Sequence, residues 1–274
     1  MNILEYPFFQ NALLGAFLAS IVCGYVGTYI VSRRLVFISG GITHASFGGI
    51  GLGVWLGINP VVSAMVFSVL SAFGIQWMAD RSDVREDSAI ALFWTFGMSV
   101  GILCSYLTPG FVADLPSYLF GSILAIDVPT LWTLAILCIV VMLLFGFFLR
   151  LIVSVAFDSE FARSQRLPVS LVDYTMMALI ALTIVATLRM VGIVLALSLL
   201  TVPQMTANLF TFSFKRIILL SIVIGWVDCV TGLFMSYWLN VPSGASIIFA
   251  SIAIYALAKT IKTLSVKFYK SETA

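Results

Sequence analysis

The chain has 274 residues, of which 61% are hydrophobic and only 9% are charged, and its mean hydropathy is +1.13. A soluble domain carries about 25% charged residues, so this chain has too few polar groups to cover a globular surface in water. The net charge is only +2, and no run of basic and aromatic residues indicates nucleic-acid binding. The composition therefore predicts an all-α, polytopic membrane helix bundle.

Nine apolar segments follow one another along the chain, and most approach the ~20 residues that a helix needs to cross a bilayer. They cover residues 12–32, 36–57, 61–79, 88–107, 128–149, 172–189, 191–211, 217–238 and 244–262. Pro203 interrupts the seventh, so eight or nine spans are predicted. The apolar part of 108–127 is too short to span and predicts an interfacial or re-entrant helix. Residues 1–274 are expected to form one transmembrane domain.

Lysine and arginine predict the orientation. If the first segment ends in the cytoplasm at Arg33 and Arg34, alternation of the spans places every basic residue except Arg189 on the cytoplasmic side. Cytoplasmic loops of membrane proteins are enriched in these residues. The N-terminus is therefore predicted to lie outside and the C-terminus inside.

The second segment, FISGGITHASFGGIGLGVWLG, carries the only histidine, His44. Small residues recur every four positions and leave a stripe that lets another helix approach closely; they are Gly41, Ala45, Gly49 and Gly53. An ionisable group at this depth is a functional candidate by default. His44 is accordingly interpreted as a residue of a polar path, with a satisfied structural histidine as the alternative.

Asp228 is the other deeply placed ionisable residue, in the run GWVDCVTG. One interpretation is a second metal ligand or a carboxylate of the same path. The other is a protonated or hydrogen-bonded carboxyl group that holds two spans together.

The loop at 157–173 has an amphipathic pattern ended by Pro168. Charged residues (Asp158, Glu160, Arg163, Arg166) surround apolar ones (Phe157, Phe161, Leu167). Asp158 would begin a short helix, where an acidic side chain complements the helix dipole. Such a helix can lie on the membrane, dock onto a partner, or only connect two spans.

The sequence offers little support for an enzyme. No GxxxxGK[ST] occurs, so the chain has no P-loop with which to hydrolyse ATP. An intramembrane hydrolase would need a base beside its nucleophile, and His44 is the only histidine of the sequence, while an intramembrane carboxylate protease would need a second aspartate beside Asp228. No catalytic residue and no permanently bound cofactor are therefore predicted, and any energy that the chain uses must come from another polypeptide or from an ion gradient.

Three blocks carry a resemblance to a known family: FISGGITHASFGGIGLG, then FDSEFARSQRLPV, then LRMVGIVLALSLLTVPQMTA followed by VPSGASIIF. Their order and spacing, from Arg33 to about Lys262, are similar to the membrane-spanning permease of ABC importers for zinc, manganese or ferrous iron. Each block alone is modest evidence, whereas the ordered set is specific.

The resemblance implies a set of residue roles and partners. Residues 158–167 resemble the coupling helix that fits a cleft on the ATPase, with Asp158, Glu160, Phe161, Arg163 and Leu167 as its contact residues. The span with His44 resembles the one that lines the metal path. The expected partners are a second permease copy, most simply in a homodimer, a cytosolic ATPase that binds ATP, an extracytoplasmic metal-binding protein, and the lipid of a bacterial or archaeal cytoplasmic membrane.

Two positions depart from the family pattern. Many members carry an aspartate four residues before the histidine, where this chain has Gly40, and an aspartate before the last span, where it has Asn240. The metal is therefore left open. The alternative function is a proton-coupled secondary carrier of metal or a small solute, with His44 and Asp228 relaying protons.

Overall fold

The computed structural model describes residues 6–81, 84–108, 123 and 126–272. All the longer elements in these residues are helices, as predicted. Their bounds are α1 (Pro7–Ser32), α2 (Val36–Leu56), α3 (Pro60–Arg81), α4 (Glu86–Leu107), α6 (Val128–Phe157), α7 (Ser159–Ser164), α8 (Val169–Leu199), α9 (Val202–Asn208), α10 (Phe214–Leu239) and α11 (Ser243–Glu272). The short helix predicted at 108–127 falls largely outside the described residues.

Seven helical stretches in the described part are long and apolar enough to cross a membrane. They lie in α1, α3, α4, α6, the first part of α8, α10 and α11. The 21-residue α2 is not among these seven but has a comparable length. Together with α2 and the shorter apolar stretch Gly192–Asn208, these spans account for the nine predicted segments.

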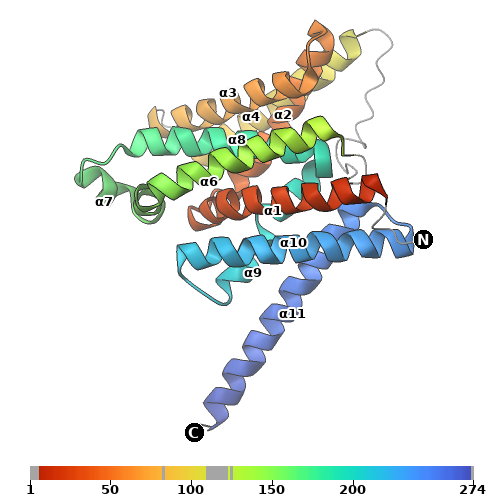
Figure 1. The fold of residues 1–274 in the computed structure, drawn as a ribbon. Coiled ribbons are helices and arrows are strands. Elements are labelled where there is room, and N and C mark those ends of the chain that lie inside the picture. Colours follow the sequence, from red (N-terminus) through yellow and green to blue (C-terminus); the bar gives the residue numbers. More distant parts are fainter. Residues whose placement is uncertain (1–5, 82–83, 109–122, 124–125, 273–274) are drawn as a thin grey trace.

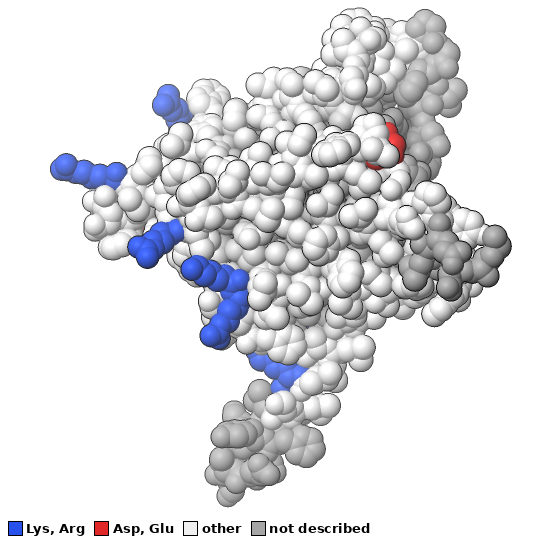
Figure 2. All heavy atoms as spheres, viewed as in Figure 1, with Lys and Arg blue, Asp and Glu red and all other residues white. Residues whose placement is uncertain are grey.

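The long helices run back and forth beside one another (Figure 1). The helix α7 lies at one end of this bundle, whereas the N-terminus lies at the other, and α11 slants away from its neighbours toward the C-terminus. The lysine and arginine side chains visible in Figure 2 gather at the end with α7 and along the edge toward the C-terminus. This arrangement agrees with the positive-inside pattern that predicted the orientation.

The seventh apolar segment is broken, as the position of Pro203 predicted. The backbone leaves helical geometry at Gly192 (φ 78°, ψ 172°), a conformation that glycine adopts without strain, and α8 ends at Leu199 before α9 begins at Val202. Pro203 lies in the first turn of α9, where its missing N–H costs no hydrogen bond. The buried Gln204 amide donates hydrogen bonds to the carbonyls of Leu199 (3.2 Å) and of Cys23 in α1 (2.7 Å), so the break is held against α1.

The centre of the bundle is formed by α1 and the first part of α8, which are more buried than the other spans. The helices α3, α4, α6 and α11 each expose a large apolar fraction, as spans that face lipid or a partner do. This packing leaves α2 between α3, α4 and α8, and it leaves α10 between α1, α9 and α11. His44 and Asp228 therefore belong to separate groups of helices.

Candidate functional site

The imidazole of His44 lies against Trp94 of α4. The two rings are parallel within 5°, with centroids 4.3 Å apart. The side chain is half-buried, and its Nδ1 atom is fully enclosed with no hydrogen-bond partner in the described part of the chain. A buried polar atom without a partner is costly, and such an atom in a native protein calls for an explanation.

The stripe of small residues packs α2 against two neighbouring helices rather than one. At its start, Gly41 lies against Ile90 and Ala45 against Gly97, both in α4. Further along, Gly49 lies against Ala64 and Gly53 against Pro60, both in α3. A helix turns by 100° per residue, so a four-residue repeat drifts around the axis by about 40° per step. The stripe therefore winds from α4 to α3.

A second set of glycines brings the backbones of α2 and α4 together. A Cβ atom on Gly48 would lie 2.7 Å from the carbonyl oxygen of Gly97, and one on Gly51 would lie 2.6 Å from that of Gly101. No side chain could occupy these positions without a shift of backbone. The sequence analysis did not single out Gly48 and Gly51, because neither belongs to the four-residue stripe.

Gly40 is one helical turn before His44 and faces open space. No atom lies within 4 Å of the position that its Cβ would occupy, whereas a Cβ on the adjacent Gly41 would lie 2.5 Å from Ile90 Cγ2. Gly40 and the accessible part of His44 therefore share a side of α2 that α3 and α4 leave uncovered. The aspartate found here in many members of the resembled family would fit without a clash.

Asp228 is completely buried between α10 and α11. Its Oδ2 atom accepts a hydrogen bond of 2.7 Å from Ser251 Oγ, while Oδ1 is enclosed with no partner among the described atoms. This contact joins two spans, as the structural interpretation of Asp228 requires. No group of three or more His, Cys, Asp or Glu residues in the described ranges is placed to hold a metal ion. A path role for Asp228 stays a prediction.

The predicted coupling helix forms at the basic end of the bundle (Figure 1). Asp158 caps it, because the backbone N–H of Phe161 donates to Asp158 Oδ1 at 2.8 Å. Phe157 and Phe161 are 65% and 60% exposed, so two aromatic rings stand out at this end. Leu167, expected on the same apolar face, packs partly against the helix core instead. Glu160 and Arg163 are exposed beside the rings.

A polar cluster behind this loop was not predicted as a site. Asp173 near the start of α8 is buried, and its Oδ1 atom accepts from Arg33 Nη2 (3.1 Å) and from the Tyr29 hydroxyl (3.4 Å). The cluster borders a cavity of about 360 Å³ that Asp80, Glu86 and Arg163 also line. Sequence reasoning used Arg33 only as a marker of orientation. The one feature of the sequence that could have indicated this cluster is Asp173, a single carboxylate near the start of an apolar helix.

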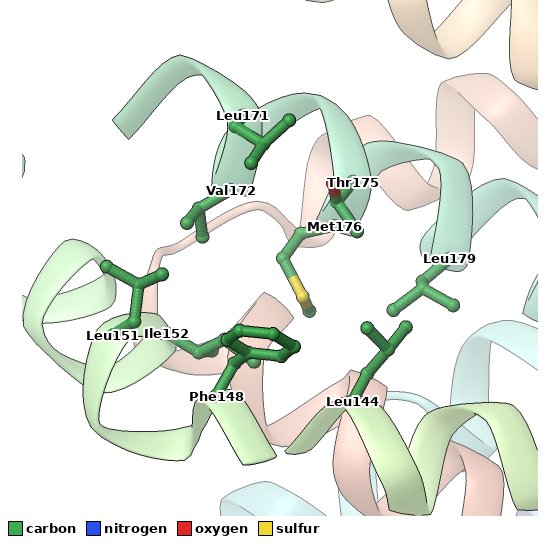
Figure 3. A pocket seen from close by; sticks show the side chains of 9 residues that line it. All are labelled: Leu144, Phe148, Leu151, Ile152, Leu171, Val172, Thr175, Met176 and Leu179. Carbon is green, nitrogen blue, oxygen red and sulfur yellow. The ribbon is translucent and has the colours of Figure 1, made fainter. Parts of the chain in front are cut away.

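A smaller, apolar cavity of about 130 Å³ lies between α6 and α8 near the same loop. Leu144, Phe148, Leu151 and Ile152 of α6 line one side, and Leu171, Val172, Thr175, Met176 and Leu179 of α8 line the other. Figure 3 shows these side chains approaching from the two helices without filling the space between them. The two helices that flank the loop are thus incompletely packed on this side.

Comparison with known proteins places these features in a family. Residues 5–262 match the ABC 3 transport family. The chain belongs to this family. The motif-based recognition of an ABC importer permease is thereby confirmed, and the members are transport subunits rather than enzymes.

Individual members match this ABC 3 family chain over nearly its whole length. The uncharacterized membrane protein slr2045 of Synechocystis sp. is 38% identical over 93% of this chain and 91% of its own length. The manganese transport system membrane protein MntC of Halalkalibacterium halodurans is 33% identical over 94% of this chain and 88% of its own. The solved structure of PsaBC from Streptococcus pneumoniae in complex with Fab has a TM-score of 0.83 and 30% identity, covering 93% of this chain and 91% of the matched chain.

Proposed function

We propose that this chain is the membrane-spanning permease subunit of a bacterial ABC importer for a divalent metal ion. The observation that carries the proposal is the match over 94% of the chain to a relative named as a manganese transport membrane protein. The ion enters from the outside and leaves at the end of the bundle where α7 and the basic residues lie. Manganese is the first ion to test because of the relative's name, with zinc and ferrous iron as the other candidates.

His44 is the residue of this chain that we assign to the path. Imidazole nitrogen binds divalent transition metals such as zinc and iron, and the half-buried ring of His44 keeps an accessible part on the side of α2 where Gly40 faces open space. One histidine cannot form a tight site, and a transported ion needs only weak binding on its way through. Two copies of the chain around a central path would supply two imidazoles.

The energy comes from a cytosolic ATPase that docks on α7. The sequence has no P-loop of its own. The residues that contribute most to binding at a protein interface are often aromatic, and Phe157 and Phe161 are exposed aromatic residues at α7. Glu160 and Arg163 beside them would set the orientation of the partner. An extracytoplasmic metal-binding protein delivers the ion to the opposite end.

The deciding experiment reconstitutes the complete complex, with its ATPase and binding protein, in lipid vesicles and measures uptake of each ion separately. Uptake that requires ATP and persists when the proton gradient is collapsed supports the importer, and the ion with the strongest uptake identifies the substrate. Uptake that resists ATP depletion and stops with the proton gradient would instead establish a secondary carrier. No uptake of any of the three ions would refute the proposed substrate class.

A further inference from the structure

Arg33 joins three helices at the base of the coupling loop. It follows the last residue of α1, and its Nη1 atom donates a 3.1 Å hydrogen bond to the backbone carbonyl of Val155 in the last turn of α6. Its Nη2 atom donates at 3.1 Å to Asp173 in the first turns of α8. The two acceptors flank the loop, since α7 lies between them in sequence. One guanidinium group therefore holds both ends of the loop against α1.

The surroundings of Arg33 indicate that its hydrogen bonds can transmit a force from α7. The main contacts of α7 are with α6 and α8, so a force on α7 passes first into these two helix ends. On one side the two ends face the apolar cavity of Figure 3, where few close contacts resist their separation. On the other side they meet Arg33, whose partner Asp173 is only 5% exposed. The Arg33 and Asp173 side chains are 22% and 6% exposed, and a partly buried ion pair is screened by salt much less than an exposed one.

We propose that Arg33 is a positioning residue of the coupling loop, which ties the ends of α6 and α8 to α1 so that a displacement of α7 moves α1 rather than opening the α6–α8 seam. The inference rests on the proposed function, because it supposes a partner that pushes on α7. The planar guanidinium can bind two separate acceptors in fixed directions, which a lysine ammonium reproduces poorly. Tyr29, which also donates to Asp173, keeps the acceptor in place.

The first test compares Arg33→Gln, Arg33→Lys and Asp173→Asn in the reconstituted complex. The matched control is Arg34→Gln, which removes the same charge from the next residue, whose side chain is exposed. We expect co-purification with the ATPase and ATP hydrolysis to persist, while the metal transported per ATP hydrolysed falls by roughly tenfold, within the usual range of coupling between distant sites. The lysine variant should lie between Arg33→Gln and the wild type, and Arg34→Gln should match the wild type.

The second test measures motion directly. Spin labels on cysteines at positions 34 and 164, which are both exposed, report the distance between the end of α1 and α7. In the otherwise wild-type complex we expect the same distance distribution with and without ATP, because the two elements move together. With Arg33→Gln we expect the distribution to broaden and to change with ATP.

The outcomes separate this inference from the proposed function. If the wild-type complex transports metal and Arg33→Gln or Asp173→Asn retains the wild-type ratio of metal to ATP, the positioning role is wrong. A wild-type distance between positions 34 and 164 that changes with ATP also overturns it. If one of the variants Arg33→Gln and Asp173→Asn is lost from the membrane and the other keeps the wild-type ratio of metal transported to ATP hydrolysed, the ion pair only stabilises the fold. This outcome contradicts the proposal. Failure of the proposed function would appear in the wild type itself, as absence of ATP-dependent uptake.

Discussion

The helix α2 has to pack closely against its neighbours and also has to leave the imidazole of His44 accessible. The glycine-rich face of α2 allows the helix to pack closely, while the imidazole needs access to a polar partner. The structure separates them around the helix: the small residues face α3 and α4, whereas His44 stacks on Trp94 at the edge of that contact. Substitutions of the small residues and of His44 can therefore test the helix packing and the proposed path separately.

We expect His44→Ala to lower metal uptake by more than about 10-fold, since even a group that only supports a metal ligand is commonly worth 10–100-fold. The variant should still assemble, because His44 is only half-buried. Uptake into vesicles and co-purification with the ATPase measure the two properties. Thr95→Ala, beside the stacked Trp94, is the control and should transport normally. Normal uptake by His44→Ala would remove this residue from the path.

Gly40→Asp should be tolerated and should strengthen the response to manganese. The open space beside Gly40 accepts a side chain, and a carboxylate one turn before His44 adds an oxygen ligand of the kind that Mn²⁺ prefers. The concentration of manganese that half-activates ATP hydrolysis is expected to fall. Gly41→Asp is the matched control: its Cβ would meet Ile90 at 2.5 Å, so the complex should be lost. An unchanged manganese response in Gly40→Asp would argue against a metal bound near His44.

At the scale of elements, α2 and α4 form the tightest pair in the described structure. Their contact depends on glycines in both helices, because a Cβ on Gly97 would lie 2.5 Å from the Cα of Ala45. Without water between lipid-embedded helices, close packing itself is a main source of association. The position of His44 is thus determined by the close contact between the backbones of α2 and α4 rather than by large side chains.

Gly97→Ala should lower the stability of the purified protein by about 1–3 kcal/mol, the usual cost of overpacking. The clash is with backbone, so it cannot be relieved by a side-chain rotation. Thermal unfolding in detergent would show a lower Tm. Gly146→Ala in α6 serves as the comparison, because nothing lies within 4 Å of the added Cβ and alanine favours a helix over glycine. Equal stability of both variants would mean that the α2–α4 contact is looser than described.

The helix α7 is too short to be stable alone, and its capping Asp158 and buried Ala162 hold it on the bundle while Phe161 projects outward. Phe161→Ala should weaken binding of the ATPase by roughly 10–30-fold, the effect of losing an aromatic anchor of about 2 kcal/mol. Glu160→Arg should also uncouple hydrolysis from uptake. Affinity is measured by titrating the ATPase onto permease in nanodiscs. Phe147→Ala, which removes a ring that is 80% exposed on the span α6, should bind normally; equal affinity of all variants would leave α7 as a connector only.

At the scale of the whole molecule, the broken segment between Gly192 and Asn208 decides the topology. If this segment is counted as a crossing of the membrane, the chain returns to the end of the bundle where α7 lies. The two termini are then at opposite ends of the bundle (Figure 1). The basic residues gathered at one end (Figure 2) assign that end to the cytoplasm.

Single cysteines can test this orientation in intact cells. A membrane-impermeant maleimide should label Asn59→Cys, in the exposed turn between α2 and α3, without any permeabilisation. Ser164→Cys, at the end of α7, should be labelled only after the membrane is opened. The four native cysteines are buried and should give little background. Labelling of Ser164→Cys in sealed cells would reverse the predicted orientation.

Much of the fold could be predicted from the sequence, because the pattern that specifies it is local. A run of about 20 apolar residues has to form a helix in lipid, where every backbone group needs an internal partner, and lysine and arginine report the side of each loop. The break near Pro203 and the Asp158 cap are local in the same sense. The ordered motifs then identified the family. His44 stood out because it is an isolated ionisable group in an apolar run.

The remaining features depend on residues that are distant along the chain. Arg33 and Asp173 are 140 positions apart, and no local pattern pairs them; the same holds for Asp228 with Ser251 and for His44 with Trp94. The drift of the small-residue stripe from α4 to α3 also required knowing where those helices lie. The sequence by itself determined the helices, their order and the family, because lipid imposes these one segment at a time. Only the tertiary structure decided which polar groups meet, because that depends on how helices far apart in the chain rotate and pack against one another.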